Sequence, residues 1–246
     1  MTLPFIPLLQ PHHFFNSTQK LKVLTGANER VIEVVQFSLP NFSDQLFTLT
    51  NLHFPQTIRT SVISRQAEYF ATRYVVAKCM QNYGYDNFQL LNDHNRVPRW
   101  PEHILGSISH SDHLAAVMIS AKSNQGMESI GVDIQTKISP EVAKEVSLLV
   151  IAPEELATMK EFGLTDDEAV SLIFSAKESI YKALNQHSPI ELDFQSVSLV
   201  KIDNQRLIFE PAVDLGNHMK AIQTLYCDYR YLEEYRAYLT ACHFAW

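Results

Sequence analysis

The sequence predicts an α+β protein of two successive halves, each with strands arranged around one long helix. Three observations lead to this prediction: a helical pattern over residues 60–80, a second over about 167–184, and strand patterns around both. The polar, turn-rich segment 122–126 separates the halves. We therefore expect an N-terminal lobe at residues 1–125 and a C-terminal lobe at residues 126–246.

In the first half, the prolines before residue 12 indicate an extended arm over residues 1–20. Arg30 to Phe37 is typical of a strand, and the region 21–58 around it is expected to supply an edge of the first sheet. The 60–80 helix follows from its period, because its apolar residues fall on one stripe: Ile63, Ala67, Phe70, Tyr74 and Ala77. The stretch 107–119 predicts a strand, a tight turn and a second strand.

In the second half, the strand 130–135 alternates apolar and polar residues, so Asp133 and Gln135 share the polar side of the pleat. A helical stretch at 141–150 and a helix start at Pro153 precede the long helix. The half closes with strands expected around 196–201, 207–209, 220–226 and 236–243.

Composition excludes several classes of protein. The chain has 246 residues, 46% hydrophobic and 19% charged, which is typical of a soluble globular protein. A net charge of -7 argues against nucleic acid as the main partner. The three widely spaced cysteines indicate buried reduced thiols, and neither a signal peptide nor a membrane-length apolar run is visible. We expect a cytoplasmic protein without stable membrane insertion.

The long helix and the 130–135 strand carry the chemistry. Glu178 and Lys182 are four residues apart and project from the same helix face. If that face meets the polar side of the strand, two carboxylates, one amide and one ammonium converge, a set that suits a divalent cation and a phosphate. The structural alternative is an ordinary surface ion pair between Glu178 and Lys182.

Basic residues of the first half form a second group of candidates. Arg65 and Arg73 lie about two helical turns apart, where a solvated helix face is the alternative, and Arg96 lies in a loop dense in turn formers. Ser109 and His110 mark a plausible anion-binding corner, although His110 is also explained as a turn histidine. A nucleophile and base pair is disfavoured there, because adjacent strand residues point to opposite faces.

Three motifs together resemble the signatures of the 4'-phosphopantetheinyl transferases of the surfactin and enterobactin type. They are the strand Ile130-Gly-Val-Asp-Ile-Gln135, the helix Phe174-Ser-Ala-Lys-Glu-Ser-Ile-Tyr-Lys-Ala183, and Trp100-Pro-Glu-His-Ile-Leu-Gly-Ser-Ile-Ser-His-Ser111. The family pattern is a G-[IV]-D-x-[EQ] strand, an [FW]-[ST]-x-K-E-[SA]-x-x-K helix and an S-H-S turn. The residues in and around the motifs look closest to the enterobactin branch.

The resemblance implies two similar lobes related by a pseudo-twofold axis, each a small antiparallel sheet packed on a long helix, with the ligand cleft between them. It implies Mg2+ as cofactor and coenzyme A as substrate. The implied metal ligands are Asp133, Gln135 and Glu178, and the implied catalytic residues are Glu178 and Lys182. The implied coenzyme A contacts are Arg65, Arg73, Arg96, Ser109, His110, Lys177 and Lys182.

The implied activity is transfer of the phosphopantetheine arm of coenzyme A to a serine of an apo carrier protein by a monomeric enzyme. Peptidyl and aryl carrier domains of siderophore synthesis are expected, and carriers of polyketide or polyunsaturated fatty-acid synthases are the alternative. Gln135 departs from the glutamate of many relatives, so we expect a two-carboxylate metal shell. A different metal-dependent phosphotransferase or nucleotide hydrolase, and a non-catalytic coenzyme A-binding module, remain open.

Overall fold

Two antiparallel sheets form the framework of the computed structural model, which describes residues 11–25, 28–123, 126–186, 192–215 and 222–245. The first sheet has the strand order β1-β2-β4-β3, and the second has the order β5-β9-β8-β7-β6. Their strands are β1 (Phe15–Thr25), β2 (Asn28–Phe37), β3 (Ile104–Ser111), β4 (Leu114–Ala121), β5 (Glu128–Thr136), β6 (Val197–Asp203), β7 (Arg206–Pro211), β8 (Leu225–Leu232) and β9 (Ala237–Ala245).

One long helix packs on each sheet, α4 (Ile63–Met80) on the first and α7 (Asp166–Leu184) on the second. The shorter helices are α1 (Pro11–Phe14), α2 (Gln45–Leu49), α3 (Gln56–Arg59), α5 (Pro140–Val150) and α6 (Pro153–Glu161). Three short 3-10 turns complete the described elements: η1 (Leu39–Asn41), η2 (Gln81–Tyr83) and η3 (Glu233–Tyr235). No helix of the described ranges is both long and apolar enough to cross a lipid bilayer.

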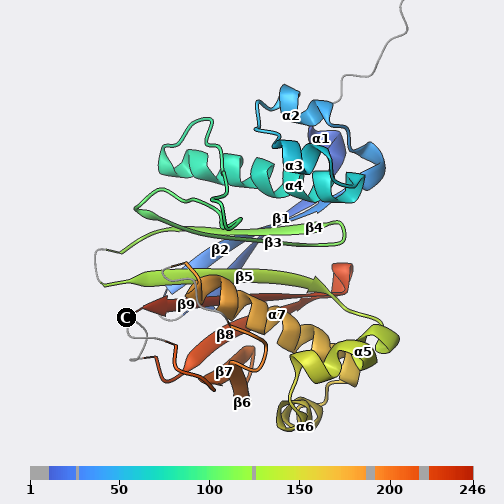
Figure 1. The fold of residues 1–246 in the computed structure, drawn as a ribbon, viewed down its shortest axis with the longest axis vertical. Coiled ribbons are helices and arrows are strands. Elements are labelled where there is room, and N and C mark those ends of the chain that lie inside the picture. The colour runs from blue at the N-terminus through green and yellow to red at the C-terminus, as the bar shows by residue number, and fades with distance from the viewer. Residues whose placement is uncertain (1–10, 26–27, 124–125, 187–191, 216–221, 246) are drawn as a thin grey trace, which may run out of the picture.

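Helix α4 lies above the first sheet, and α7 runs in front of the second sheet, where it packs against β5 and β9 (Figure 1). The inner faces of the two sheets meet in a shared apolar cluster that includes Val34 and Met118 from the first sheet and Val132 and Leu239 from the second. This layering follows from strand alternation, because each sheet buries one face against its helix and the other against the second sheet.

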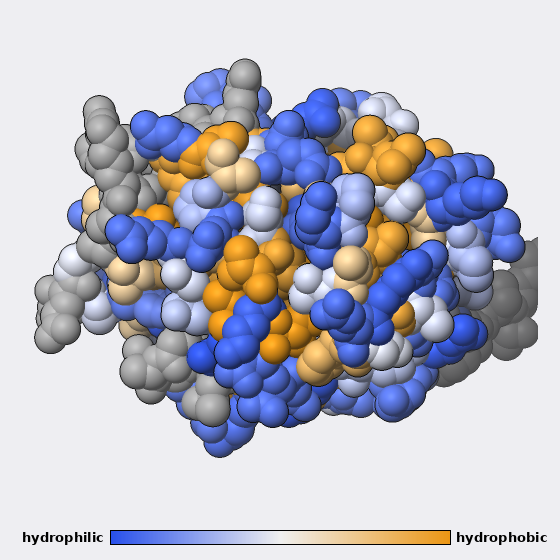
Figure 2. All heavy atoms as spheres, turned by 90° about the horizontal axis from the view of Figure 1, so that it is seen from below, coloured by the Kyte–Doolittle hydropathy of each residue, from blue (hydrophilic) through white to orange (hydrophobic). Residues whose placement is uncertain are grey.

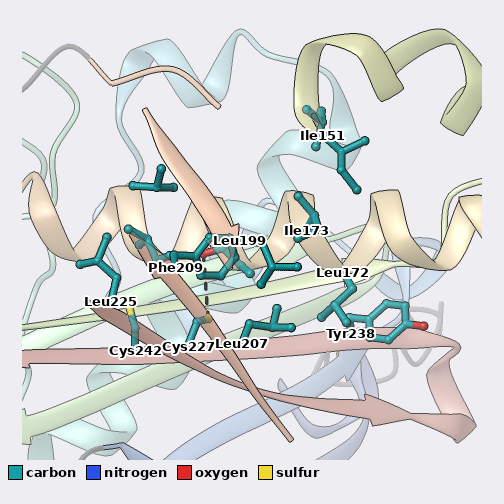
Figure 3. Close-up of a cluster of buried hydrophobic side chains, with 14 of the residues drawn as sticks. Ile151, Leu172, Ile173, Leu199, Leu207, Phe209, Leu225, Cys227, Tyr238 and Cys242 are labelled. Atoms are coloured by element: carbon teal, nitrogen blue, oxygen red, sulfur yellow. Dashed lines mark hydrogen bonds between the residues drawn. The ribbon is translucent and has the colours of Figure 1, made fainter. Parts of the chain in front are cut away.

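The core beneath α7 joins that helix to four strands of the second sheet (Figure 3). Leu172 and Ile173 of α7 point into a cluster with Phe209 of β7 and Cys242 of β9. Cys227 and Cys242 are both buried and free, and Cys79 is half-buried and free. Cys227 and Cys242 match the expected buried thiols, whereas Cys79 is only partly buried.

Most features that the sequence predicts are found, with three corrections. The protein is α+β, as predicted, whereas the pseudo-twofold relation and the 125/126 boundary stay predictions. The strand predicted at 30–37 is β2, and residues 21–25 lie in the edge strand β1, as expected for the region 21–58, but β1 starts within the segment expected to be an extended arm. The strand expected at 220–226 begins only at Leu225, with residues 220–221 outside the described residues. Ile63 of the predicted apolar stripe is 62% exposed.

Candidate active site

The start of α7 is fixed by charged and capping residues. Glu168 accepts a hydrogen bond from the backbone nitrogen of Thr165 at 3.0 Å, which satisfies a free N–H at the helix start. Lys137, just beyond β5, pairs with both Asp167 and Glu168 at 3.0 Å. The acidic first turn also suits the positive end of the helix dipole. These contacts anchor the helix next to the end of β5.

Close packing then brings α7 onto β5. Gly131 of β5 lies directly beneath the backbone of Ser179, so that a Cβ atom at this glycine would come within 1.8 Å of the Ser179 carbonyl oxygen. The Ser179 hydroxyl also bonds to the Thr240 hydroxyl of β9 at 2.7 Å. Small side chains at this crossing therefore place the Glu178 and Lys182 face of the helix beside Asp133.

Asp133 is the centre of the site and is only 5% exposed. Its Oδ1 atom accepts hydrogen bonds from the Ser109 hydroxyl of β3 and from the Lys182 ammonium of α7, each at 2.6 Å. The Lys182 ammonium also lies 3.1 Å from the Ser109 hydroxyl oxygen and 3.4 Å from the carbonyl oxygen of Val132. β5 and α7 thus meet at one carboxylate, as the sequence predicts for Asp133 and Lys182, and β3 joins them through Ser109, which the sequence did not predict.

The two oxygens of Asp133 differ: Oδ1 is paired with Lys182 and Ser109, whereas Oδ2 is not used by that ion pair. Oδ2 is buried and finds no hydrogen-bond partner among the described residues. A buried carboxylate oxygen without a partner carries a large desolvation cost unless a cation or a donor reaches it. This atom is therefore the best-placed ligand for a metal ion in the site.

Glu178 and Gln135 supply the other predicted metal ligands. Burial raises the pKa of Glu178, the charge of Lys182 opposes that shift, and the charge of Asp133 adds to it, so all three groups act on one another. Gln135 donates its amide nitrogen to the carbonyl oxygen of Thr136 at 2.8 Å, which leaves its amide oxygen as the candidate ligand. Within the described part of the chain, no three His, Cys, Asp or Glu side chains gather to hold a metal.

His110 forms a cationic corner with α4. The Arg65 guanidinium lies 2.6 Å from the His110 Nε2 atom, and because arginine only donates, that nitrogen is the acceptor. The Nδ1 atom lies 3.5 Å from the Glu68 carboxylate, which also pairs with Arg65 at 3.3 Å. Burial and the charges of Arg65, Lys182 and Arg73 lower the pKa of His110 to about 4. A neutral imidazole among three cations suits an anionic ligand.

The low pKa of His110 predicts a pH dependence of stability. The unfolded chain binds this proton near pH 6.5 and the folded chain only near pH 4, so the free energy of unfolding falls as the pH drops through that window. The side chain is 34% exposed, so solvent screens its interactions, and we expect the free energy of unfolding to fall by only about 1–2 kcal/mol. Urea unfolding of the wild type and His110→Asn at pH 7 and pH 4.5 measures it. Equal losses in both proteins would contradict the assignment.

Arg73 is buried rather than on the helix surface, so the solvated-face alternative is wrong for this residue. It is 8% exposed, donates to the Asn92 side chain at 2.8 Å and lies over the Tyr69 ring at 4.2 Å. The loop that begins at Asn92 also carries Arg96, which is exposed and has a positive φ of 66°. Arg73 thus holds the loop of Arg96, and direct contact of Arg73 with coenzyme A stays a prediction.

Lys177 does not fit its predicted role at a phosphate of coenzyme A. Its side chain is 2% exposed, and its ammonium donates to the Glu155 carboxylate at 2.8 Å and to the carbonyl oxygens of Val150 and Phe194. All three hydrogens of an ammonium are used by these bonds. Burial lowers the pKa of Lys177, although Glu155 opposes that shift. The residue instead joins α5, α6 and α7.

A pocket of ≈ 460 Å³ lies between the 95–102 loop, β3 and the end of α7. Its lining includes Arg96, Trp100, Lys182 and Gln186, so residues of both halves contribute. Trp100 packs against Gly106, where a Cβ atom would come within 2.3 Å of the indole ring. The motif therefore needs glycine at position 106, because a larger residue would clash with the Trp100 ring that lines this pocket.

Two residues of the site were missed by the sequence reasoning. The i,i+3 spacing of Glu68 from Arg65 could have placed Glu68 at the His110 corner. Gln186 donates to the carbonyl oxygens of Gly106 and Ile130, and thereby bridges β3 and β5. No local pattern predicts such a bridge, because both acceptors are distant in sequence.

Comparisons with known proteins fit this geometry. A family model described as "4'-phosphopantetheinyl transferase N-terminal domain" matches residues 54–120, and one described as "4'-phosphopantetheinyl transferase superfamily" matches residues 129–240. Enterobactin synthase component D of Escherichia coli (strain K12) is 32% identical over 169 residues, which are 68% of this chain and 77% of the relative. The chain belongs to the 4'-phosphopantetheinyl transferase superfamily. This phosphopantetheinyl transferase is therefore an enzyme.

Two further relatives of the phosphopantetheinyl transferase share less of their length with it. Enterobactin synthase component D of Salmonella typhi is 30% identical over 154 residues, covering 63% of this chain and 62% of the relative. The "4'-phosphopantetheinyl transferase Svp" of Streptomyces mobaraensis is 24% identical over 163 residues, covering 64% and 65%. The family resemblance inferred from the three motifs is thus confirmed.

Proposed function

We propose that this enzyme carries out Mg2+-dependent transfer of the 4'-phosphopantetheine arm of coenzyme A to a serine of a carrier protein. The observation that carries the proposal is the convergence of β3, β5 and α7 at Asp133, whose buried Oδ2 atom has no hydrogen-bond partner in the described part of the chain. The cationic corner of Arg65 and His110 adjoins that point through Ser109. A carboxylate centre beside a cluster of cations suits a metal-bound pyrophosphate.

The residues present fit a magnesium ion. Two carboxylates with an amide oxygen and waters match the hard oxygen ligands that Mg2+ prefers, and Asp133 Oδ2 supplies an otherwise unsatisfied ligand. Asp133, Glu178 and Gln135 would hold the ion. When bound, it would neutralise charge on the pyrophosphate oxygens of coenzyme A.

The protein residues then position the substrates and move one proton. The carrier serine oxygen forms a bond to the phosphorus that bears pantetheine, and the bond from that phosphorus to the bridging oxygen breaks. Adenosine 3',5'-bisphosphate leaves with the bridging oxygen. Glu178 takes the serine proton, since burial raises the pKa of this carboxylate toward that of a useful base. Lys182 stabilises the charge that develops on the leaving oxygen.

Four of the predicted coenzyme A contacts remain available to the ligand in this proposal. Arg65 and His110 would bind one phosphate at the cationic corner, and Arg96 and Lys182 would bind from the wall of the pocket that they share. Arg73 would act by holding the Arg96 loop through Asn92. Lys177 is not included, because its side chain is only 2% exposed and its ammonium is bound within the core, whereas the Lys182 side chain is 25% exposed.

Two relatives are named enterobactin synthase component D, which supports a role in enterobactin synthesis. We propose peptidyl and aryl carrier domains of siderophore synthesis as the first partners. Carriers of polyketide or polyunsaturated fatty-acid synthases are the second candidate. Because the enzyme has a net charge of -7, we propose an apolar contact with the carrier. The face seen in Figure 2 carries hydrophobic patches, and Leu148 and Leu149 of α5 are 84% and 70% exposed. We also propose a cytoplasmic monomer.

The test is the mass of an isolated apo peptidyl carrier domain after incubation with the enzyme, coenzyme A and Mg2+. The expected result is a gain of roughly 340 Da, the mass of one phosphopantetheine arm on a serine, which disappears when EDTA is added. Aryl, acyl and polyketide carriers are assayed in parallel to rank the partners. Unmodified carriers with intact coenzyme A binding would point to the non-catalytic module, and cleavage of coenzyme A without a carrier to a hydrolase.

Gln135→Glu should tighten Mg2+ binding. The substitution restores a third negative charge beside the proposed cation, so we expect the half-saturating Mg2+ concentration to fall by about tenfold. Carrier modification measured across a Mg2+ titration gives this concentration. Gln135→Met removes the amide oxygen at similar length and should raise it. An unchanged value in both variants would place residue 135 outside the metal shell.

A further inference from the structure

The Ser109 hydroxyl faces the proposed metal site and not the cationic corner. Ser109 is 6% exposed, and its hydroxyl donates to Asp133 Oδ1 at 2.6 Å. The same oxygen lies 3.1 Å from the Lys182 ammonium, which can only donate. A serine hydroxyl has one hydrogen, and here that hydrogen is given to a carboxylate. It is therefore not available to a phosphate oxygen of coenzyme A.

We propose that Ser109 is a positioning residue for the metal ligand Asp133, supplied by the first sheet to a site on the second. The inference rests on the proposed Mg2+ site and replaces the sequence-based assignment of Ser109 to coenzyme A. Ser109 and Lys182 both bind the same carboxylate oxygen, Oδ1, and so fix the plane of the carboxyl group. The fixed plane leaves Oδ2 as the ligand atom. Hydrogen bonds of this kind orient metal ligands and strengthen binding.

Three serines of β3 contact β5, namely Ser107, Ser109 and Ser111, and only Ser109 binds the Asp133 carboxylate. The Ser107 hydroxyl oxygen accepts from the Val132 backbone nitrogen at 3.0 Å, and Ser111 accepts from the Thr136 backbone nitrogen at 3.1 Å. These two contacts satisfy N–H groups at the free edge of β5, which otherwise would lack a strand partner. Ser107 is 5% exposed, so it is a matched control for Ser109 in burial, strand and size.

The experiment separates a metal-positioning role from a phosphate-binding role by two binding measurements. Free Mn2+, detected by electron paramagnetic resonance, reports cation binding to the protein without coenzyme A. Calorimetry in EDTA then gives the ratio of the affinities for coenzyme A and 3'-dephospho-coenzyme A. We compare the wild type with Ser109→Ala, Ser107→Ala and His110→Ala, and confirm by circular dichroism that each variant is folded.

For Ser109→Ala we expect Mn2+ affinity to fall by about 10-fold or more, with the affinity ratio unchanged. Ser107→Ala should change neither quantity, and His110→Ala should change only the ratio. Ser109→Thr keeps the hydroxyl and should restore Mn2+ affinity, which excludes a general packing defect. Unchanged Mn2+ affinity in Ser109→Ala, or a ratio that falls as in His110→Ala, would overturn the inference and leave the proposed function standing.

Absence of Mn2+ binding by the wild type would be a different result. It would overturn the metal site of the proposed function and, with it, the role given to Ser109. An equal loss of Mn2+ affinity in Ser107→Ala and Ser109→Ala would show that the contact between β3 and β5 affects the site only by stabilising the fold. That result would also overturn the inference.

Discussion

Glu178→Gln is expected to lower kcat for carrier modification by roughly 10²–10⁴-fold, the contribution of a positioned general base. The amide keeps the size and hydrogen-bonding shape of the side chain but cannot accept the serine proton. Glu178 is half-buried, and its pKa is raised by burial, lowered by the charge of Lys182 and raised by that of Asp133, which supports its proposed place at the reacting centre. Single-turnover labelling of an apo carrier with saturating coenzyme A measures the loss.

The same variant separates two roles of Glu178. If the residue serves only as a metal ligand, raising Mg2+ to saturation should restore kcat, because the defect is then one of cation affinity. If it is the base, kcat stays low at every Mg2+ concentration. Glu68→Gln provides a control on α4 that removes a carboxylate near Arg65 but leaves the proposed base in place. Full activity of Glu178→Gln without added Mg2+ would refute both roles.

Gly131→Ala should damage stability and catalysis together. The new Cβ atom would lie 1.8 Å from the carbonyl oxygen of Ser179, and a backbone atom cannot turn aside as a flexible side chain can. The helix α7 must therefore shift by more than an ångström. Overpacking of this kind costs roughly 1–3 kcal/mol, and a shift of that size at catalytic groups costs about 10²-fold in rate.

Urea unfolding and carrier labelling of Gly131→Ala, at a temperature where the variant is fully folded, give the two effects separately. The control is Gly84→Ala, which meets nothing within 4 Å but has a positive φ of 82°. It should lose about 1 kcal/mol of stability through backbone strain and keep its kcat. If Gly131→Ala retains wild-type kcat, the position of α7 on β5 does not limit catalysis.

The residue pairs that share one element were predictable from the sequence. The helical period places Glu178 and Lys182 on one face, and strand alternation places Asp133 and Gln135 on one side of β5, because both repeats are properties of the local backbone. The same regularities predict both long helices and the strand pair that carries Ser109 and His110. The family motifs then indicate why these particular faces matter.

The partners of each charged group were decided by the tertiary structure. Lys177 and Lys182 lie on the same helix five residues apart, yet Lys177 enters the core with Glu155, and Lys182 reaches Asp133. Ser109 likewise faces a carboxylate of another sheet. A backbone period determines which side chains share a face but not what packs against it, since the free energy of that choice comes from burial and pairing between distant segments. The sequence by itself thus determined the family and the reactive groups, and packing determined which of them can reach a ligand.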